Sequence, residues 1–275
     1  MSDQTLPQPK TAKKIKRTPP VHPVESESIL GFLWDAIKLS GETISTIVRG
    51  KFALHDLVVQ MASIGVDGSW IVIAIAMSTG AVFALYTATF ALSFGFAEAV
   101  GGTIAYAELN ELGPVLGGIA FAARSGAAIA AEIGTMVVTE QVDALKAMAV
   151  PPVRYLVAPR VLAAVLILPF LTVLADIAGL FGGYLSATAS GVPGGTYLAS
   201  IYKYARASDL TNGLIKSLVF AFLIGIIACL QGLKTKQGAT GVGRSTTRSV
   251  VFCVISMVIA DLFLAFILKQ QGGAR

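Results

Sequence analysis

Five long apolar runs, separated by short polar segments, dominate the pattern of hydrophobic and polar positions along this chain. Each run provides the roughly 20 apolar residues that a helix needs to cross a bilayer. We therefore expect an all-α membrane protein with five transmembrane helices, at about residues 70–97, 112–138, 155–189, 210–233 and 250–268. The third run is longer than one span, which predicts a helix that is tilted, kinked near Pro169, or interrupted at Gly179, Gly182 and Gly183.

The segment before the first run, residues 29–63, mixes apolar and charged positions and is too polar to span. Its apolar residues recur at helical spacing, so we interpret it as one or two amphipathic helices in the membrane interface, where Trp34 suits headgroup depth. A cytoplasmic helix packed on the base of the protein is the alternative. Residues 1–28 are expected to form a disordered basic cytoplasmic tail near anionic lipid, and residues 269–275 a short C-terminal tail.

Small residues recur at every fourth position in the second and third runs. The stripes are Gly113 with Gly117, Ala123 with Ala127 and Ala131, and Gly179 with Gly183. Such spacing lets helix backbones approach closely in lipid. The second run is nearly all small residues over 117–134, so we expect it to be buried. A dimer interface, a substrate path or packing within the chain would each explain that burial.

Composition agrees with a chain whose surface faces lipid. Of its 275 residues, 55% are hydrophobic and 13% are charged, whereas a soluble domain carries roughly 25% charged residues. Cys229 and Cys253 lie in apolar runs and are expected to be small buried hydrophobic residues. His22 and His55 lie outside the runs, so we expect no His and Cys metal cluster and no cofactor. No cleavable signal peptide is expected.

The basic residues predict the orientation of the chain in the membrane. Eight lysines and arginines precede the first run, and none lies in the loop expected over residues 98–111. The later connections carry three, two and four basic residues in turn. By the positive-inside rule the N-terminus is then cytoplasmic and the C-terminus lies outside. Lys269 and Arg275 oppose this assignment weakly.

Charged residues within the apolar runs need an explanation, because charge inside a bilayer is unfavourable. Arg124 and Glu132 lie eight residues apart and are expected to share a helical face. Asp176, Lys216 and Asp261 lie in the third, fourth and fifth runs. These residues either line a polar path or gate, or form structural ion pairs between helices, such as Arg124 with Asp176 or Glu132. We favour the second interpretation for each residue taken singly.

Residues 139–148 predict a short charged helix between the second and third runs. Thr139 can cap it, Glu140 lies in the first turn, and Pro151 stops it. Val142, Leu145 and Met148 fall on one side. A helix held between two spans in this way is suited to receive force from a soluble motor. The residues assigned to this role are Thr139, Glu140, Gln141, Val142, Asp143, Leu145 and Met148. A solvated loop helix is the alternative.

The chain lacks the sequence signals of an enzyme that works alone. No glycine-rich phosphate-binding loop of the G-x-x-x-x-G-K-[ST] form occurs, and no arrangement on a soluble face indicates catalysis. If the protein moves a solute actively, the energy comes from another chain or from an ion gradient.

Several motifs in a fixed order resemble the MlaE/YrbE permease family of ABC lipid transporters. They are ELGPVL at 111–116, AAEIGTMVVTEQVDALKAM at 130–148, RYLVAPR at 154–160, LIKSLVFAF at 214–222 and GVGRSTTRSVV at 241–251. The likeness covers about residues 29–268. Many members carry a basic residue just before ELGP, whereas this chain has Asn110, so Glu111 becomes the nearest charged candidate for a lipid headgroup contact.

The resemblance implies a homodimer of five-span permeases with an interfacial N-terminal helix. It also implies a cytoplasmic ABC ATPase subunit that docks on the coupling helix at 139–148, and an MCE-domain substrate-binding protein on the outer side. The family's lipid cavity lies at the dimer interface, which points to span one and the start of span two. Lipid-path or gating candidates are Glu98, Glu111, Arg124, Glu132, Asp176 and Asp261.

We therefore predict the permease subunit of an ABC transporter that moves phospholipid or a similar amphiphile between the inner membrane and the outer envelope. No nucleic-acid partner is expected. An ion-coupled secondary transporter that uses Glu132, Asp176 or Asp261 as proton sites is the alternative, although no internal repeat is evident. A non-transporting scaffold is a third possibility, against which the segment at 139–148 argues.

Overall fold

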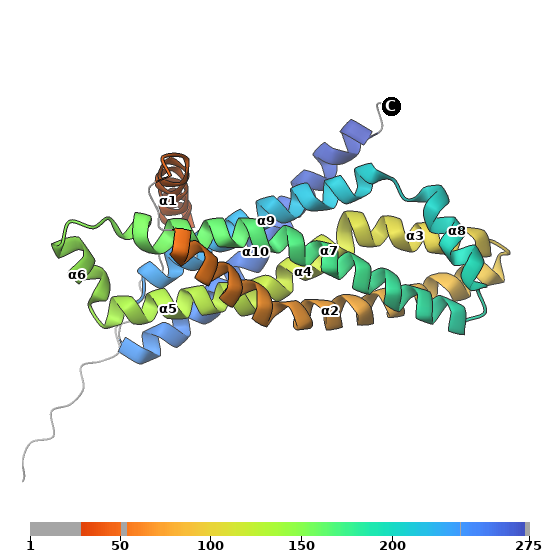
Figure 1. The fold of residues 1–275 in the computed structure, drawn as a ribbon, viewed down its shortest axis with the longest axis horizontal. Helices are drawn as coiled ribbons and strands as arrows, with labels where there is room; N and C mark the ends of the chain where they lie inside the picture. Colours follow the sequence, from red (N-terminus) through yellow and green to blue (C-terminus); the bar gives the residue numbers. More distant parts are fainter. Residues whose placement is uncertain (1–28, 51–53, 237, 273–275) are drawn as a thin grey trace, which may run out of the picture.

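The chain folds into a long bundle of helices in the computed structural model, which describes residues 29–50, 54–236 and 238–272 (Figure 1). The N-terminal tail and the last three residues lie outside the described part. The α-helices are α1 (Ile29–Val48), α2 (Leu54–Ser93), α3 (Val100–Ala107), α4 (Gly113–Phe121), α5 (Ala127–Val138), α6 (Gln141–Ala147), α7 (Ala158–Ala189), α8 (Gly194–Tyr204), α9 (Ala207–Leu233) and α10 (Gly238–Gly272). A 3₁₀ turn, η1 (Ala97–Ala99), and three π-helical turns, η2 (Glu108–Leu112), η3 (Ala122–Gly126) and η4 (Val153–Val157), join some of them.

Five helical segments are long and apolar enough to cross a membrane, which confirms the predicted fold class. They are Leu57–Ser93, Ala97–Val138, Val153–Ala189, Ala207–Leu233 and Gly238–Leu268. The expected loop over residues 98–111 is wrong, because α3 and η2 continue the second segment there and bury Val100, Ile104 and Glu108. The first segment also begins earlier than expected, so residues 54–63 belong to α2 and not to the N-terminal amphipathic helix.

Glycines let α2 and α7 approach closely. A Cβ atom at Gly80 would collide with the carbonyl oxygen of Gly179, and one at Gly182 would collide with that of Met77. Close backbone approach through small residues is a main source of helix packing in lipid. The predicted interruption of α7 is therefore wrong. The helix runs unbroken through Pro169 and its glycines, which serve as contact points.

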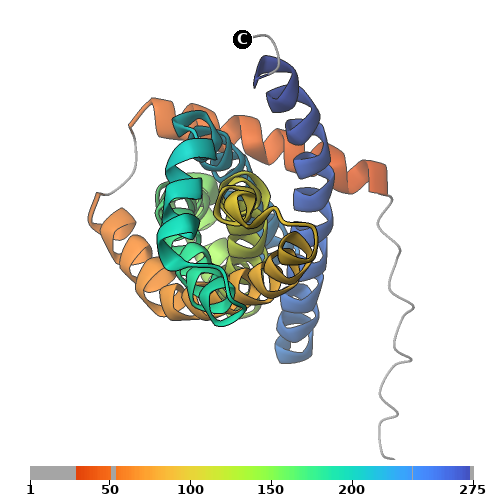
Figure 2. The same cartoon turned by 90° about the vertical axis from the view of Figure 1, so that its right-hand side faces the viewer.

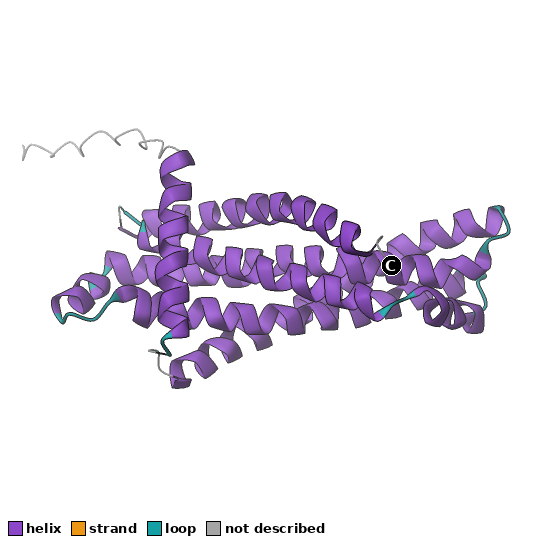
Figure 3. Cartoon of the chain, turned by 90° about the horizontal axis from the view of Figure 1, so that it is seen from above, coloured by secondary structure: helices purple, strands orange, loops and turns teal. Residues whose placement is uncertain are grey.

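Helix α1 lies across the bundle near the end that carries α6 (Figure 3). The Phe32 ring stacks on Phe252 of α10 with centroids 4.7 Å apart. Asp35 accepts from Lys234, just after α9, at 2.6 Å. Leu30, Trp34 and other apolar side chains of α1 remain exposed. The helix thus has a face fixed to α9 and α10 and an apolar face left free.

A polar stripe explains much of the motif at 241–251. Ser245 accepts a hydrogen bond from Thr235 at 2.8 Å, and Ser249 donates to the Gly126 carbonyl at the end of η3 at 3.4 Å. Cys253 continues the stripe and donates to the Ile224 carbonyl at 3.7 Å. The stripe fixes α10 to η3, α9 and the residues just after α9 through short side chains. Cys229 and Cys253 are both free and buried, as predicted.

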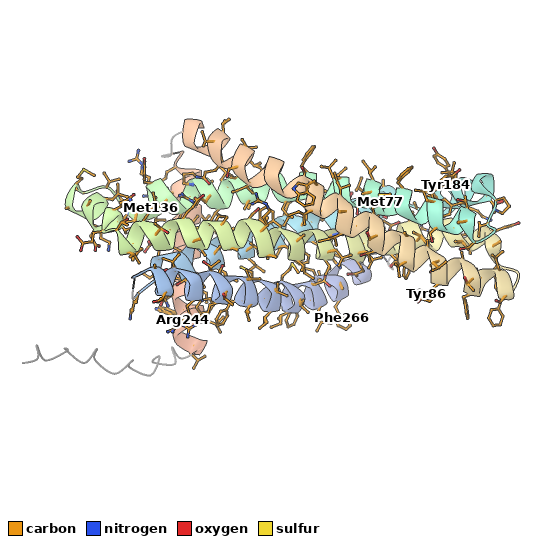
Figure 4. All side chains as sticks on the ribbon, turned by 90° about the horizontal axis from the view of Figure 1, so that it is seen from below. Met77, Tyr86, Met136, Tyr184, Arg244 and Phe266 are labelled. Carbon is orange, nitrogen blue, oxygen red and sulfur yellow. The ribbon has the colours of Figure 1, made fainter. Side chains whose placement is uncertain are left out.

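The two ends of the bundle differ in character. Figure 4 places Met136 and Arg244 toward the end with α6, and Tyr86 and Tyr184 toward the end with α3 and α8. The other basic residues of the connections at the α6 end include Lys146, Arg154 and Lys234. Figure 2 shows α10 along the outside of the ring formed by the other spans.

Candidate functional site

A charge cluster of Glu111, Lys216 and Asp261 joins three spans inside the bundle. Lys216 of α9 is 2% exposed, and its Nζ donates to Oε2 of Glu111 in η2 at 2.6 Å. The same Nζ lies 2.9 Å from Oδ1 of Asp261 in α10. That oxygen has no hydrogen-bond partner, so the second contact is an ion pair whose angles do not suit a hydrogen bond. Two acidic side chains thus share one basic side chain.

The cluster is open on one side. The Glu111 side chain is 47% exposed, whereas Lys216 is enclosed. Asn110, which directly precedes Glu111, accepts from Asn212 of α9 at 3.3 Å and donates to the Tyr106 carbonyl at 3.1 Å. A neutral amide network therefore stands beside Glu111. This arrangement can hold a polar group of a ligand that enters from the open side.

Each of the three π turns carries at least one charged residue. Glu108 and Glu111 lie in η2, Arg124 in η3 and Arg154 in η4. A π turn adds a residue to the helical turn and often marks a functional site. In η2 it directs Glu111 toward α9 while Glu108 packs on α7.

Glu108 is the residue that the sequence reasoning missed, because it fell in the expected loop. It is 0% exposed and packs on Gly179 of α7, one turn from the buried Asp176. Both carboxylates lack a hydrogen-bond partner. The signal that could have found Glu108 was its spacing, since it precedes Glu111 by three residues and so falls near it on a helix. We call Glu108 and Asp176 the acid pair.

The sequence suggested that Glu132 or Asp176 pairs with Arg124, but the structure gives these two carboxyl groups other surroundings. Glu132 of α5 accepts from Arg160 of α7 at 3.0 Å, and Asp176 has no hydrogen-bond partner. Arg160 is nearly buried and also donates to the Leu156 carbonyl at 3.0 Å. A cavity of about 240 Å³ lies beside this pair, lined in part by Gln60, Met136 and Tyr155. The pair therefore ties the end of span two to the start of span three.

Helix α6 projects from the bundle between spans two and three. Val142 is buried, but the Asp143 side chain is 71% exposed and Met148 is also exposed. The prediction that Thr139 caps α6 is wrong. Thr139 is the C-cap of α5 and its hydroxyl donates to the Thr135 carbonyl at 2.8 Å, while Gln141 donates to Thr139 at 3.0 Å. Leu145, on the same side as Val142, is half-buried.

Two residues in the left-handed region bracket α6. Glu140 has φ 60° before the helix and Ala149 has φ 57° after it. At the far end the Val150 amide donates to the Leu145 carbonyl at 2.9 Å, and the Ala149 amide donates to the Lys146 carbonyl at 3.0 Å. This is a Schellman motif, in which glycine is the usual left-handed residue. The motif, and not Pro151 alone, ends the helix.

Glu98 lies far from these groups. It is exposed in η1, at the end of the bundle opposite α6, next to the exposed Phe94 and Phe96. Among the described residues, no group of three or more His, Cys, Asp or Glu side chains is placed to hold a metal ion.

Comparison with known proteins gives a consistent result. The family model described as Permease MlaE matches residues 57–267. A probable ABC transporter permease protein of Rickettsia prowazekii is 40% identical over 229 residues, which cover 80% of this chain and 86% of the relative. One from Synechocystis is 37% identical, over 86% of this chain and 91% of the relative. The Arabidopsis thaliana protein TRIGALACTOSYLDIACYLGLYCEROL 1, chloroplastic, is 32% identical, over 88% of this chain and 70% of the relative.

Proposed function

This chain belongs to the MlaE permease family of ABC transporters, and from that premise we propose that it moves a phospholipid or similar amphiphilic lipid between the inner membrane and the outer envelope. It is an integral membrane protein, and a partner ATPase is implied because relatives are named as ABC transporter permeases. The name of the Arabidopsis relative refers to a glycolipid, which supports a lipid as cargo. Membership of this family also argues against the ion-coupled alternative.

The observation that carries the proposal is the form of α6. It is a short helix at the end where the basic connections gather, held by Val142 and left exposed at Asp143 and Met148. Its left-handed brackets give a tight turn at each end. We propose that α6 is the coupling helix and inserts into a groove of the ATPase, with the N-terminus of the chain on the same, cytoplasmic side.

The charge cluster supports a lipid path inside the membrane. Glu111 is half-exposed and held by Lys216, so it can meet a polar headgroup without leaving its ion pair. We propose that the cavity forms where span one and the start of span two meet a second copy of the chain. Exposed apolar side chains on α10, among them Val258, Leu262 and Phe266, provide a face for lipid or for that copy. An MCE-domain protein would receive lipid at the outer end, near α8.

Charge reversal on α6 tests the coupling role. In the variant Glu140→Lys with Asp143→Lys, we expect the ATPase no longer to co-purify, because reversal of charges that meet basic groups in an interface costs several kcal/mol. The permease itself should still reach the membrane, since both residues lie outside the spans. The matched control is Glu98→Lys, the same change at the opposite end, which should leave ATPase recruitment intact.

Wild-type recruitment and transport in the double variant would show that the acidic side of α6 is merely solvated.

Mass spectrometry of the lipids that co-purify with the complex tests the cargo. A complex that carries no enriched lipid class, and whose ATPase does not respond to added phospholipid, would contradict the lipid assignment while leaving the coupling role standing.

A further inference from the structure

Glu108 and Asp176 lie on neighbouring spans, and the carboxyl group of each is buried in space that a glycine of the other span leaves open. Glu108 is 0% exposed and Asp176 is 3% exposed. A Cβ atom at Gly179 of α7 would collide with the Glu108 carboxyl group, and one at Gly113, after η2, would collide with a carboxyl oxygen of Asp176. The exchange is reciprocal, because Gly179 follows Asp176 by less than one turn and Gly113 follows Glu108 by one π turn. The acid pair is therefore a fitted contact between spans two and three.

All four carboxyl oxygens of the acid pair lack a hydrogen-bond partner. An ionised carboxylate that is removed from water without a donor or a cation is strongly unfavourable. Two such groups close enough for their charges to interact cannot both be ionised at low cost. The site must therefore hold something that neutralises it.

The surrounding groups do not provide that neutralisation. On α9, Lys216 is bound to Glu111 and Asp261, and Asp209 accepts from the Arg206 amide at 2.9 Å. Asn110 and Asn212 are bonded to each other, and Met77 and Gly80 of α2, which pack on the glycines of α7, do not titrate.

Tyr197 of α8 is a buried phenol that packs on Gly183 of α7. Burial raises the pKa of Tyr197 above its usual range, so the phenol stays neutral. Its hydroxyl donates to the Leu180 carbonyl at 3.2 Å. Its one proton is thus directed to the backbone of α7 and not to the acid pair.

We propose that Glu108 and Asp176 form a proton-binding site. In this conformation the pair holds at least one proton. The bound proton removes a negative charge from the buried site and so lets span two pack on span three. Any motion that parts α7 from η2 and admits water lets the pair ionise and release the proton. Acid therefore favours the packed arrangement and alkali favours its opening.

Infrared spectroscopy tests the proposal directly. The full-length chain, reconstituted in phospholipid bilayers, should show a carboxylic-acid C=O band at neutral pH that shifts in D₂O. Glu108→Gln and Asp176→Asn should each shift or remove the band, and the double variant should abolish it. Glu42→Gln, which removes an exposed carboxylate on α1, should leave it unchanged. If the double variant does not accumulate in the membrane, the two single variants carry the test.

Hydrogen exchange provides a second measurement. After correction for intrinsic rates, the amides of residues 179–183 should exchange several-fold faster in alkaline than in neutral buffer, and the double variant should lose this dependence. Absence of the band in the wild-type protein would overturn the proposal. So would a band that appears only when inorganic cations are removed, because the pair would then hold a cation, and so would a band that neither single variant changes.

Discussion

Removal of the Lys216 ammonium should expose how much the charge cluster contributes to stability. Lys216→Met keeps an unbranched apolar stem, one atom shorter than the lysine side chain, but leaves Glu111 and Asp261 without their shared cation. At an effective dielectric constant of about 20, unit charges 2.6 and 2.9 Å apart attract each other by about 6 kcal/mol per pair. Desolvation of the buried ammonium offsets most of that attraction in the folded protein.

The cost of the substitution comes from the charges it leaves behind. Removing one partner of a buried ion pair costs about 3–5 kcal/mol, because the remaining charge is uncompensated. Glu111 is 47% exposed and can turn toward polar groups outside the protein, while the Asp261 side chain is 21% exposed and can do so less. We therefore expect a loss near the lower end, about 3 kcal/mol.

Denaturant unfolding of the chain in lipid bicelles would measure this loss, with transport assayed in parallel. The companion variant combines Lys216→Met with Glu111→Gln and Asp261→Asn, so that no charge remains. Its stability should return to within about 1 kcal/mol of wild type, since a neutral replacement of a buried ion cluster is often tolerated. Transport by the neutral variant should stay low if Glu111 contacts the headgroup. A Lys216→Met protein within about 0.5 kcal/mol of wild type, or a neutral variant no more stable than it, would refute the reasoning.

Three further outcomes follow from the packing and the connections. Gly80→Ala should push α2 away from the Gly179 carbonyl and lower the free energy of unfolding by about 1–3 kcal/mol, whereas Gly195→Ala, where a Cβ atom would meet no atom within 4 Å, should leave it unchanged. Equal melting temperatures for the two variants would contradict this. Ala149→Gly should relieve the left-handed residue after α6 by up to about 1 kcal/mol and slow hydrogen exchange at Val150, so faster exchange would count against the Schellman motif. In a background without Cys229 and Cys253, Ser190→Cys should react with an impermeant thiol reagent from outside and Thr240→Cys only after permeabilisation, and the reverse pattern would invert the proposed orientation.

Apolar run length and order were enough to predict the five spans, because lipid requires long uninterrupted helices. The loop expected over 98–111 failed for a definite reason. Glu108, Asn110 and Glu111 lower the local hydropathy, yet their polar groups are buried or paired inside the protein and the helix continues. Hydropathy cannot distinguish a polar residue that faces another helix from one in a loop.

The partner of Glu132 could not be predicted from spacing along one helix. A regular helix places Arg124 and Glu132 near one face, but Arg124 lies within the π turn η3, which departs from the regular spacing. Glu132 then meets Arg160, which the sequence places 28 residues away. The acid pair could not be predicted from the sequence either, since its reciprocal fit to Gly113 and Gly179 depends on how two spans cross.

The continuous helical segment from Ala97 to Val138 sets the height of the molecule. Its 42 residues would extend about 60 Å at 1.5 Å per residue, whereas the hydrocarbon core of a bilayer is about 30 Å thick. Even a steeply tilted segment of this length stands well clear of the acyl chains on at least one side. If α6 is cytoplasmic, as we propose, the emerging part is the end with α3 and α8, where Tyr86, Phe90 and Phe94 are 72%, 67% and 62% exposed. Aromatic rings raised above the bilayer in this way need cover from another chain or from a lipid in transit.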